Sequence, residues 1–147
     1  MDWNEYFFSM LEPIAQKSKD TNTKIGCIIV AKDNSVRAIG FNGFPRKVND
    51  QIQQHPERFQ RPEKYAWTVH AEANAVCAAA KVGVPLEGCR IYLNWLPCCA
   101  CAGLIIQAGI GEVYISHHNA EDIIQFPQFR FDVSLQMFRE AEVKVFV

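Results

Sequence analysis

Two short segments of the sequence hold side chains that bind soft metals, together with one carboxylate. They are residues 70–72 (His-Ala-Glu) and residues 97–101 (Pro-Cys-Cys-Ala-Cys). Zinc prefers imidazole and thiolate ligands arranged as a tetrahedron. Cys98 and Cys101 are three positions apart, so at the start of a helix both sulfurs face the same way and can reach one metal. The residue types and spacing predict a zinc site formed by His70, Cys98 and Cys101.

Three protein ligands leave the fourth position of zinc open, which is typical of a catalytic rather than a structural site. Zinc lowers the pKa of a bound water from about 15.7 to about 7, so a hydroxide nucleophile is available near neutral pH. Glu72 follows His70 by two residues and must therefore lie near the metal. It is predicted to take the water proton and deliver it to a ring nitrogen and to departing ammonia.

Other interpretations of these motifs have to be weighed. A Cys-x-x-Cys pair alone is also found in redox proteins and as half of a structural zinc site. A redox pair would not require the preceding proline or a His-x-Glu at an earlier helix start. A structural site would need a fourth Cys or His, for which the remaining imidazoles are His55, His117 and His118.

The remaining cysteines are predicted to pack rather than bind metal. Cys99 follows Cys98 directly, so on a helix it points about 100° away. Cys27, Cys77 and Cys89 stand among apolar residues and are expected in the core. The cluster at residues 98–101 is unlike a disulfide framework, which favours a reducing compartment.

Hydrophobic spacing and turn residues predict the elements that position these motifs. The 147 residues are expected to form one domain over 1–147, an α/β fold with a mixed five-stranded sheet and helices on both faces, that is, a three-layer α-β-α sandwich. In chain order we expect a helix over 3–14, strands over 25–31 and 36–41, a long loop over 43–67, a helix over 71–82, a strand over 90–93, a helix over 99–108, a strand over 112–116, a helix over 133–142 and a strand over 143–147.

Composition narrows the classes of function. The net charge is −1, which argues against a large nucleic-acid surface and favours a small charged substrate. The longest apolar runs, such as residues 25–31, are far shorter than a membrane span. The first residues lack the basic start and apolar stretch of a signal peptide. We therefore expect a soluble, cytoplasmic protein.

His-x-Glu followed by Pro-Cys-x-x-Cys is the recognised signature of zinc deaminases. Beyond this signature the chain resembles the deoxycytidylate (dCMP) deaminases of the cytidine deaminase-like superfamily, over residues 5 to about 116. The resemblance is carried by residues 18–27 (SKDTNTKIGC), 40–45 (GFNGFP) and 70–76 (HAEANAV). It implies hydrolysis of dCMP to dUMP and ammonia, and a place in the supply of thymidylate. Some members of the family carry a second, structural zinc, but this sequence offers no convincing second ligand set, so one Zn²⁺ per chain is predicted.

The resemblance also implies roles for residues around the substrate. Asn42 would hydrogen-bond the deoxyribose, and the backbone around Ala71 would recognise the pyrimidine O2. Trp95 and Leu96 would flank the base and direct its exocyclic amine.

Many members of the family are homo-oligomers, often hexamers, activated by dCTP and inhibited by dTTP. The regulatory nucleotide site would involve the loop after the second strand, and nearby cations could meet its phosphates. The residues expected there are Gly40, Phe41, Gly43, Lys24, Arg46 and Lys47.

Three positions depart from the family pattern. Phe41 replaces the usual Tyr and loses a hydroxyl at the expected regulatory site. Thr21 replaces the Pro of an Asp-Pro pair, and Cys99 replaces the second Pro of Pro-Cys-Pro-x-Cys. The spacing of the metal ligands survives all three changes.

Three alternative functions remain open from the sequence. The first is a deaminase of tRNA or single-stranded DNA, which would need a basic channel and exposed aromatic side chains. The second is an enzyme that also accepts dCTP as a substrate. The third is a zinc-stabilised nucleotide-sensing module without activity, in which Glu72 would be dispensable.

Overall fold

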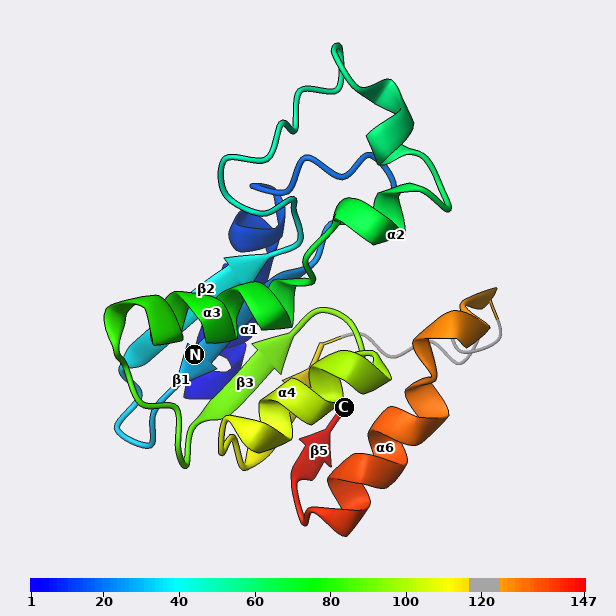
Figure 1. Cartoon of the computed structure of the whole chain (residues 1–147). Helices are drawn as coiled ribbons and strands as arrows, with labels where there is room; N and C mark the ends of the chain where they lie inside the picture. Colours follow the sequence, from blue (N-terminus) through cyan, green and yellow to red (C-terminus); the bar gives the residue numbers. More distant parts are fainter. Residues whose placement is uncertain (117–124) are drawn as a thin grey trace.

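A five-stranded mixed sheet forms the centre of the computed structural model, which describes residues 1–116 and 125–147 (Figure 1). The strand order is β2-β1-β3-β4-β5. β1 pairs antiparallel with β2 and β3, whereas β3, β4 and β5 run parallel. The strands are β1 (Gly26–Val30), β2 (Val36–Phe41), β3 (Arg90–Leu93), β4 (Glu112–Ile115) and β5 (Lys144–Phe146).

Helices cover both faces of the sheet, which confirms the predicted three-layer fold. α1 packs on one face through the first two strands and β3, while α3, α4 and α6 form the layer on the other face. The helices are α1 (Trp3–Ala15), α2 (Lys64–Trp67), α3 (Ala71–Val82), α4 (Cys99–Gln107) and α6 (Phe131–Glu140), with short 3-10 helices η1 (Pro56–Phe59) and η2 (Pro127–Phe129). No helix in the described ranges is long and apolar enough to cross a membrane.

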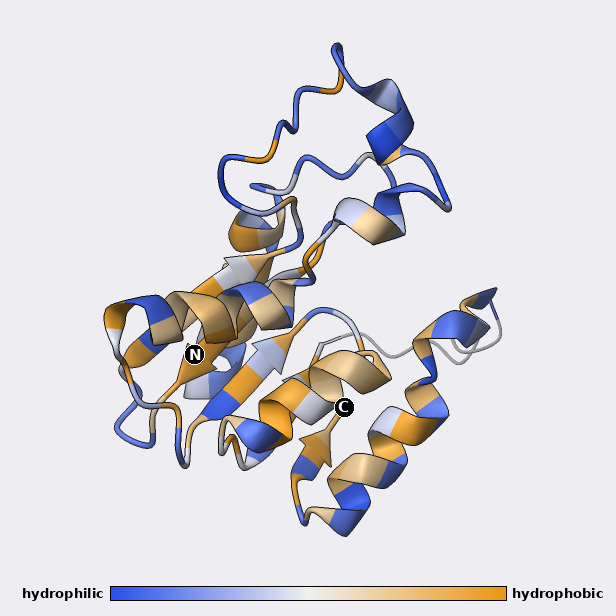
Figure 2. Ribbon diagram, in the orientation of Figure 1, coloured by the Kyte–Doolittle hydropathy of each residue, from blue (hydrophilic) through white to orange (hydrophobic). Residues whose placement is uncertain are grey.

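The apolar pattern of the strands explains the two layers. β1 is buried along its whole length, as expected of a continuous apolar strand covered on both faces. Phe7, Leu11 and Ile14 of α1 pack with Ile28 and Tyr92 on one side. The larger core on the other side joins the sheet to α3, α4 and α6. Figure 2 shows mostly hydrophobic colours along α3 and α4, whereas the loop over 43–67 is largely hydrophilic.

A glycine in β2 fixes the position of α3. A Cβ at Gly40 would lie 2.3 Å from the carbonyl oxygen of Ala71 and 2.6 Å from the nitrogen of Ala75. The helix backbone therefore sits directly on the strand, because Gly40 and the alanines leave room for it. This contact sets the position of the first turn of α3, which carries His70 and Glu72.

The elements differ from the sequence predictions mainly at their ends. Pro13 lies inside α1, and the helix continues to Ala15, so the proline does not shorten it. The last helix begins at Phe131 rather than at residue 133. The long loop over 43–67 contains η1 and α2. Phe44 packs on Phe59 within this loop, with ring centroids 4.9 Å apart.

Candidate metal centre and active-site pocket

Two helix N-termini meet at the predicted metal site. His70 is the N-cap residue of α3 and Cys98 is the N-cap residue of α4. Cys101 lies in the first turn of α4. The N-terminus of a helix carries partial positive charge and stabilises thiolates. The fold therefore places the two sulfurs where their anionic, metal-binding form is favoured.

The three predicted ligands converge with spacing suited to zinc. The His70 Nδ1 atom lies 3.4 Å from the Cys98 Sγ atom and 3.5 Å from the Cys101 Sγ atom. Ligands on a tetrahedral zinc with usual bond lengths stand about 3.6 Å apart for a nitrogen–sulfur pair. Among the described residues, these three alone form a group of this kind, with all ligand atoms within 4.8 Å of one another. The donor set and its dimensions fit Zn²⁺, and Zn²⁺ is the cofactor of this chain.

The electrostatics of the cluster favour a cation. A hydrogen bond from the Cys101 thiol and the nearby His70 imidazole lower the pKa of the Cys98 thiol to about 4. Its hydrogen bond with Cys98 and its burial raise the pKa of the Cys101 thiol, and a hydrogen bond with Cys98 raises the pKa of the His70 imidazole. A divalent cation bound here would hold all three groups in their deprotonated, metal-binding forms.

Glu72 lies beside this cluster in the first turn of α3. Its side chain is buried, with 3% of the residue exposed, and it lines the same pocket as His70 and Cys98. Burial raises the pKa of the Glu72 carboxyl, although its own backbone amide and His70 oppose the shift. A buried carboxyl next to a metal site can exchange protons with groups bound there.

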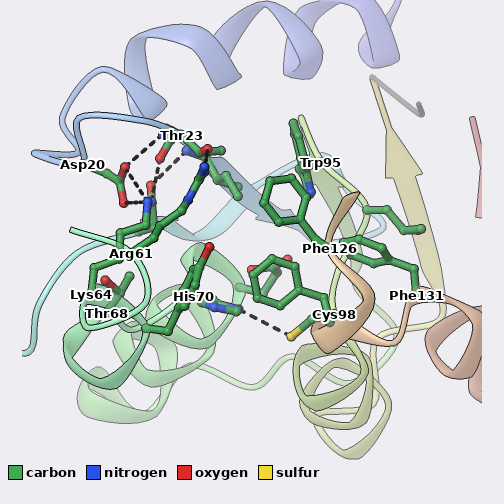
Figure 3. Close-up of a pocket in the computed structure, with 16 residues that line it drawn as sticks. Asp20, Thr23, Arg61, Lys64, Thr68, His70, Trp95, Cys98, Phe126 and Phe131 are labelled. Carbon is green, nitrogen blue, oxygen red and sulfur yellow. Dashed lines mark hydrogen bonds and ion pairs between the residues drawn. The ribbon is translucent and has the colours of Figure 1, made fainter. Parts of the chain in front are cut away.

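A pocket opens at the metal cluster (Figure 3). Aromatic side chains form part of its walls, and a group of polar side chains stands away from Cys98. The lining residues are Asp20, Thr23, Ile25, Asn42, Arg61, Lys64, Tyr65, Thr68, His70, Glu72, Trp95, Leu96, Cys98, Phe126, Phe129 and Phe131. The pocket combines a metal site, a buried carboxyl and flat apolar surfaces, which suits a small aromatic-ring substrate.

Three of the residues expected around the substrate line this pocket: Asn42, Trp95 and Leu96. The Asn42 amide accepts a hydrogen bond from the Ile25 N–H and donates one to the Thr23 carbonyl, both at 2.9 Å. It therefore holds the loop before β1 as well as facing the pocket. Ala71 is buried at the start of α3 and is not among the lining residues.

The expected regulatory residues separate into three groups. Phe41 and Gly43 line a second cavity, which shares Asn42, Asp20, Lys64 and Thr68 with the first. Gly40 lies beneath α3. Lys24, Arg46 and Lys47 are exposed and line neither of these two cavities.

Several residues that line the pocket were not predicted as site residues from the sequence. The Lys64 ammonium lies 3.1 and 3.0 Å from the two carboxylate oxygens of Asp20, an ion pair between buried side chains. Asp20 belongs to a segment that carries the family resemblance, so its importance had a sequence signal. Arg61 and Phe126 had none.

The other cysteines and histidines also differ in part from expectation. Cys27 and Cys89 are buried as predicted, but Cys77 is exposed, so that prediction was wrong. It lies on the side of α3 that faces away from the sheet. His55 pairs with Glu57 within the loop at 3.1 Å, while His117 and His118 lie outside the described residues.

Sheet order, metal cluster and buried carboxyl together define a zinc-dependent deaminase. Such an enzyme hydrolyses a C–N bond, so that an oxygen from water takes the place of an amino group. Comparison with known proteins agrees. The sequence profile of the cytidine and deoxycytidylate deaminase zinc-binding region matches residues 1–117. The chain belongs to this deaminase family.

Individual relatives give the same assignment. The chain is 38% identical over 143 residues to an uncharacterized deaminase in the luxG 3′ region of Aliivibrio fischeri, covering 97% of this chain and 91% of the relative. It is 35% identical over 127 residues to human deoxycytidylate deaminase, covering 83% and 70%. The dCMP deaminase of cyanophage S-TIM5 superposes with a TM-score of 0.72 at 25% identity, covering 96% of this chain and 93% of that one.

Proposed function

We propose that this deaminase acts on dCMP and releases dUMP and ammonia. The observation that carries the proposal is the buried Glu72 carboxyl beside the His70, Cys98 and Cys101 cluster, at the base of an aromatic pocket. The named activity of the human relative, 35% identical over most of this chain, supports dCMP as the substrate.

In the proposed mechanism, the Nδ1 atom of His70 and the two sulfurs hold the metal. When bound there, zinc supplies a Lewis acid that makes a water molecule acidic near neutral pH. The sulfurs are held by the first turn of α4, and His70 by the contact of α3 with Gly40. This chain therefore keeps its ligands in place through helix packing rather than through a flexible loop.

Glu72 is proposed to move the protons of the reaction. The carboxylate takes a proton from the attacking water and gives it to N3 of the cytosine ring as the water oxygen bonds to C4. Glu72 then transfers the proton of the new C4 hydroxyl to the exocyclic amine. The bond between C4 and that nitrogen breaks as the C4 carbonyl forms, and ammonia leaves. Burial raises the pKa of the Glu72 carboxyl, which brings it nearer the range in which a group both accepts and donates protons.

The rest of the pocket is proposed to hold the nucleotide. Trp95 and Leu96 flank the base, the Ala71 backbone recognises its O2, and Asn42 hydrogen-bonds the deoxyribose. The positions of Asn42, Trp95 and Leu96 in the pocket lining support these roles.

The proposal also covers regulation by nucleotides and the oligomeric state of the enzyme. We propose that dCTP activates and dTTP inhibits the enzyme, and that it is a cytoplasmic homo-oligomer that feeds thymidylate synthesis. Six chains, the number in many family members, is the proposed size of the oligomer. The second cavity beside Phe41 and Gly43 supports a regulatory site next to the catalytic one, since the two cavities share wall residues. Gly40 would contribute by setting the position of β2, which carries Phe41. Lys24, Arg46 and Lys47 would attract the phosphates of a regulatory nucleotide from the protein surface.

A substrate panel tests the proposal. The zinc-loaded protein is assayed for ammonia release from dCMP, dCTP, CMP and deoxycytidine, each with and without dTTP, and from single-stranded DNA and tRNA. We expect dCMP to have the highest kcat/KM and dTTP to reduce it. Preferred turnover of a polynucleotide or of dCTP would contradict the substrate assignment. No turnover of any of them would favour the non-enzymatic nucleotide-sensing module.

A further inference from the structure

The first pocket contains two cationic side chains, Arg61 and Lys64, and in the part of the chain that the structure describes they differ in how many of their donors are already bonded. The Lys64 ammonium is buried and directs its donors to both Asp20 oxygens and, at 3.4 Å, to the Asn22 side chain. Asp20 also accepts hydrogen bonds from the Asn22 and Thr23 backbone amides. The hydrogen-bonding groups of this ion pair are therefore used within the protein, where the pair holds the loop before β1 in place.

Arg61 is differently placed. Among the described residues, its guanidinium has one hydrogen-bond partner, the Thr23 hydroxyl at 3.4 Å, and no carboxylate within ion-pair distance. One face of the group lies toward the Phe126 ring, 5.2 Å from its centroid. A guanidinium has five N–H donors in a planar fork, so most of its donors remain for a ligand in the pocket.

The position of Arg61 matches a substrate with an anionic end. In Figure 3 the Arg61 side chain extends toward Thr23, on the side of the pocket away from Cys98. A nucleotide whose base reaches the metal cluster would direct its sugar past Asn42, which is hydrogen-bonded to the Thr23 carbonyl. Its phosphate would then arrive beside the Thr23 hydroxyl and the Arg61 fork.

We infer that Arg61 and the Thr23 hydroxyl form the subsite for the 5′-phosphate of the substrate. Arginine binds phosphate through two parallel charged hydrogen bonds, and threonine adds a hydroxyl donor. Arg61 is therefore the residue that makes the enzyme select a nucleotide over a nucleoside. This inference rests on the proposed function, because it assumes that the base occupies the metal end of the pocket.

Binding of the product and of its nucleoside isolates the contribution of the phosphate. Calorimetric titrations with dUMP and with deoxyuridine are made on zinc-loaded wild type, Arg61→Gln and Arg61→Lys. Arg58→Gln is the matched control, since Arg58 lies on η1 of the same loop, stacks on Trp67 and lines neither cavity. Zinc content and thermal unfolding of each variant verify that it is folded.

We expect Arg61→Gln to weaken dUMP binding at least about 10-fold, the loss of one charged hydrogen bond, and to leave deoxyuridine binding unchanged. Arg61→Lys keeps the charge without the fork and should give a smaller loss. Arg58→Gln should change neither. In wild type, inorganic phosphate should compete with dUMP, and in Arg61→Gln this competition should weaken.

Unchanged dUMP binding in Arg61→Gln would overturn the inference, and so would an equal loss of dUMP and deoxyuridine, which would indicate a structural role. The proposed function is judged separately from dCMP turnover by wild type. If dUMP binding depends on Arg61 but dCMP is not deaminated, the phosphate subsite stands and the substrate assignment fails.

Discussion

The Nδ1 atom of His70 lies 3.4 Å from the Sγ atom of Cys98, although the two residues are 28 positions apart in the chain. Each caps the N-terminus of a helix, and α3 and α4 pack side by side in the same layer. The metal site is therefore a consequence of how two helices start, and each ligand is fixed by the main chain that follows it.

Adjacent cysteines provide a direct test of the ligand set. Cys98→Ser should reduce the zinc content of the purified protein from one ion per chain to nearly none, because it removes one of two thiolates. Cys99→Ser should retain the metal, since Cys99 is absent from the cluster. Metal analysis after dialysis measures both. Retention of zinc by Cys98→Ser, or its loss from Cys99→Ser, would show that the ligands are misassigned.

Glu72 should be required for turnover and not for metal binding. Glu72→Gln keeps the shape of the side chain but cannot accept a proton, so kcat for dCMP should fall by about 10² to 10⁴. Zinc content and thermal stability should stay near those of wild type. Activity within a few-fold of wild type would remove Glu72 from the mechanism.

The fold and the metal cluster were predictable because their determinants are local. The spacing of Cys98 and Cys101 needs only the start of one helix, and β1 is recognisable as a continuous apolar run. The phosphate subsite was not predictable, because Arg61 acquires its role only when the loop over 43–67 packs against Thr23, 38 residues earlier. The prediction for Cys77 failed because the faces of an alanine-rich helix differ too little in hydrophobicity. The sequence alone therefore does not show which face of α3 meets the sheet.

Because Gly40 packs closely against the backbone of α3, substitution of this glycine should reduce the stability of the protein. Gly40→Ala should lower the free energy of unfolding by about 2 kcal/mol or more, since the added methyl group would meet helix backbone that cannot rotate away. Gly103→Ala is the control: Gly103 lies inside α4, and among the described residues nothing outside the local helix backbone comes within 4 Å of its added Cβ. Alanine there should stabilise by about 1 kcal/mol. Urea unfolding measures both. Equal effects of the two substitutions would contradict the packing account.

The Asp20–Lys64 ion pair should make stability depend on pH. Burial raises the pKa of Asp20, but hydrogen bonds from Thr23 and Asn22 and the Lys64 ammonium outweigh it and hold the pKa below its usual value. The carboxylate therefore stabilises the folded state above the unfolded pKa of about 3.9, and this contribution is lost as the pH falls through the lower folded pKa.

Asp20→Asn should consequently destabilise the protein by about 3 kcal/mol near neutral pH, because it leaves the Lys64 ammonium buried without its partner. The difference from wild type should shrink as the pH falls from the unfolded pKa of Asp20 through its lower folded pKa, because the wild-type carboxyl then becomes protonated as well. Unfolding curves of both proteins across this range measure the difference. A difference that stays constant with pH would show that the charge of Asp20 is not what stabilises the loop.

X-ray absorption at the zinc edge of the metal-loaded protein tests the central claim most directly. We predict two sulfur ligands at about 2.3 Å and one imidazole nitrogen at about 2.0–2.1 Å, with the fourth position occupied by an oxygen that exchanges with solvent. A third sulfur, or a second imidazole in the fourth position, would mean a closed structural site and would contradict a hydrolytic role for this pocket.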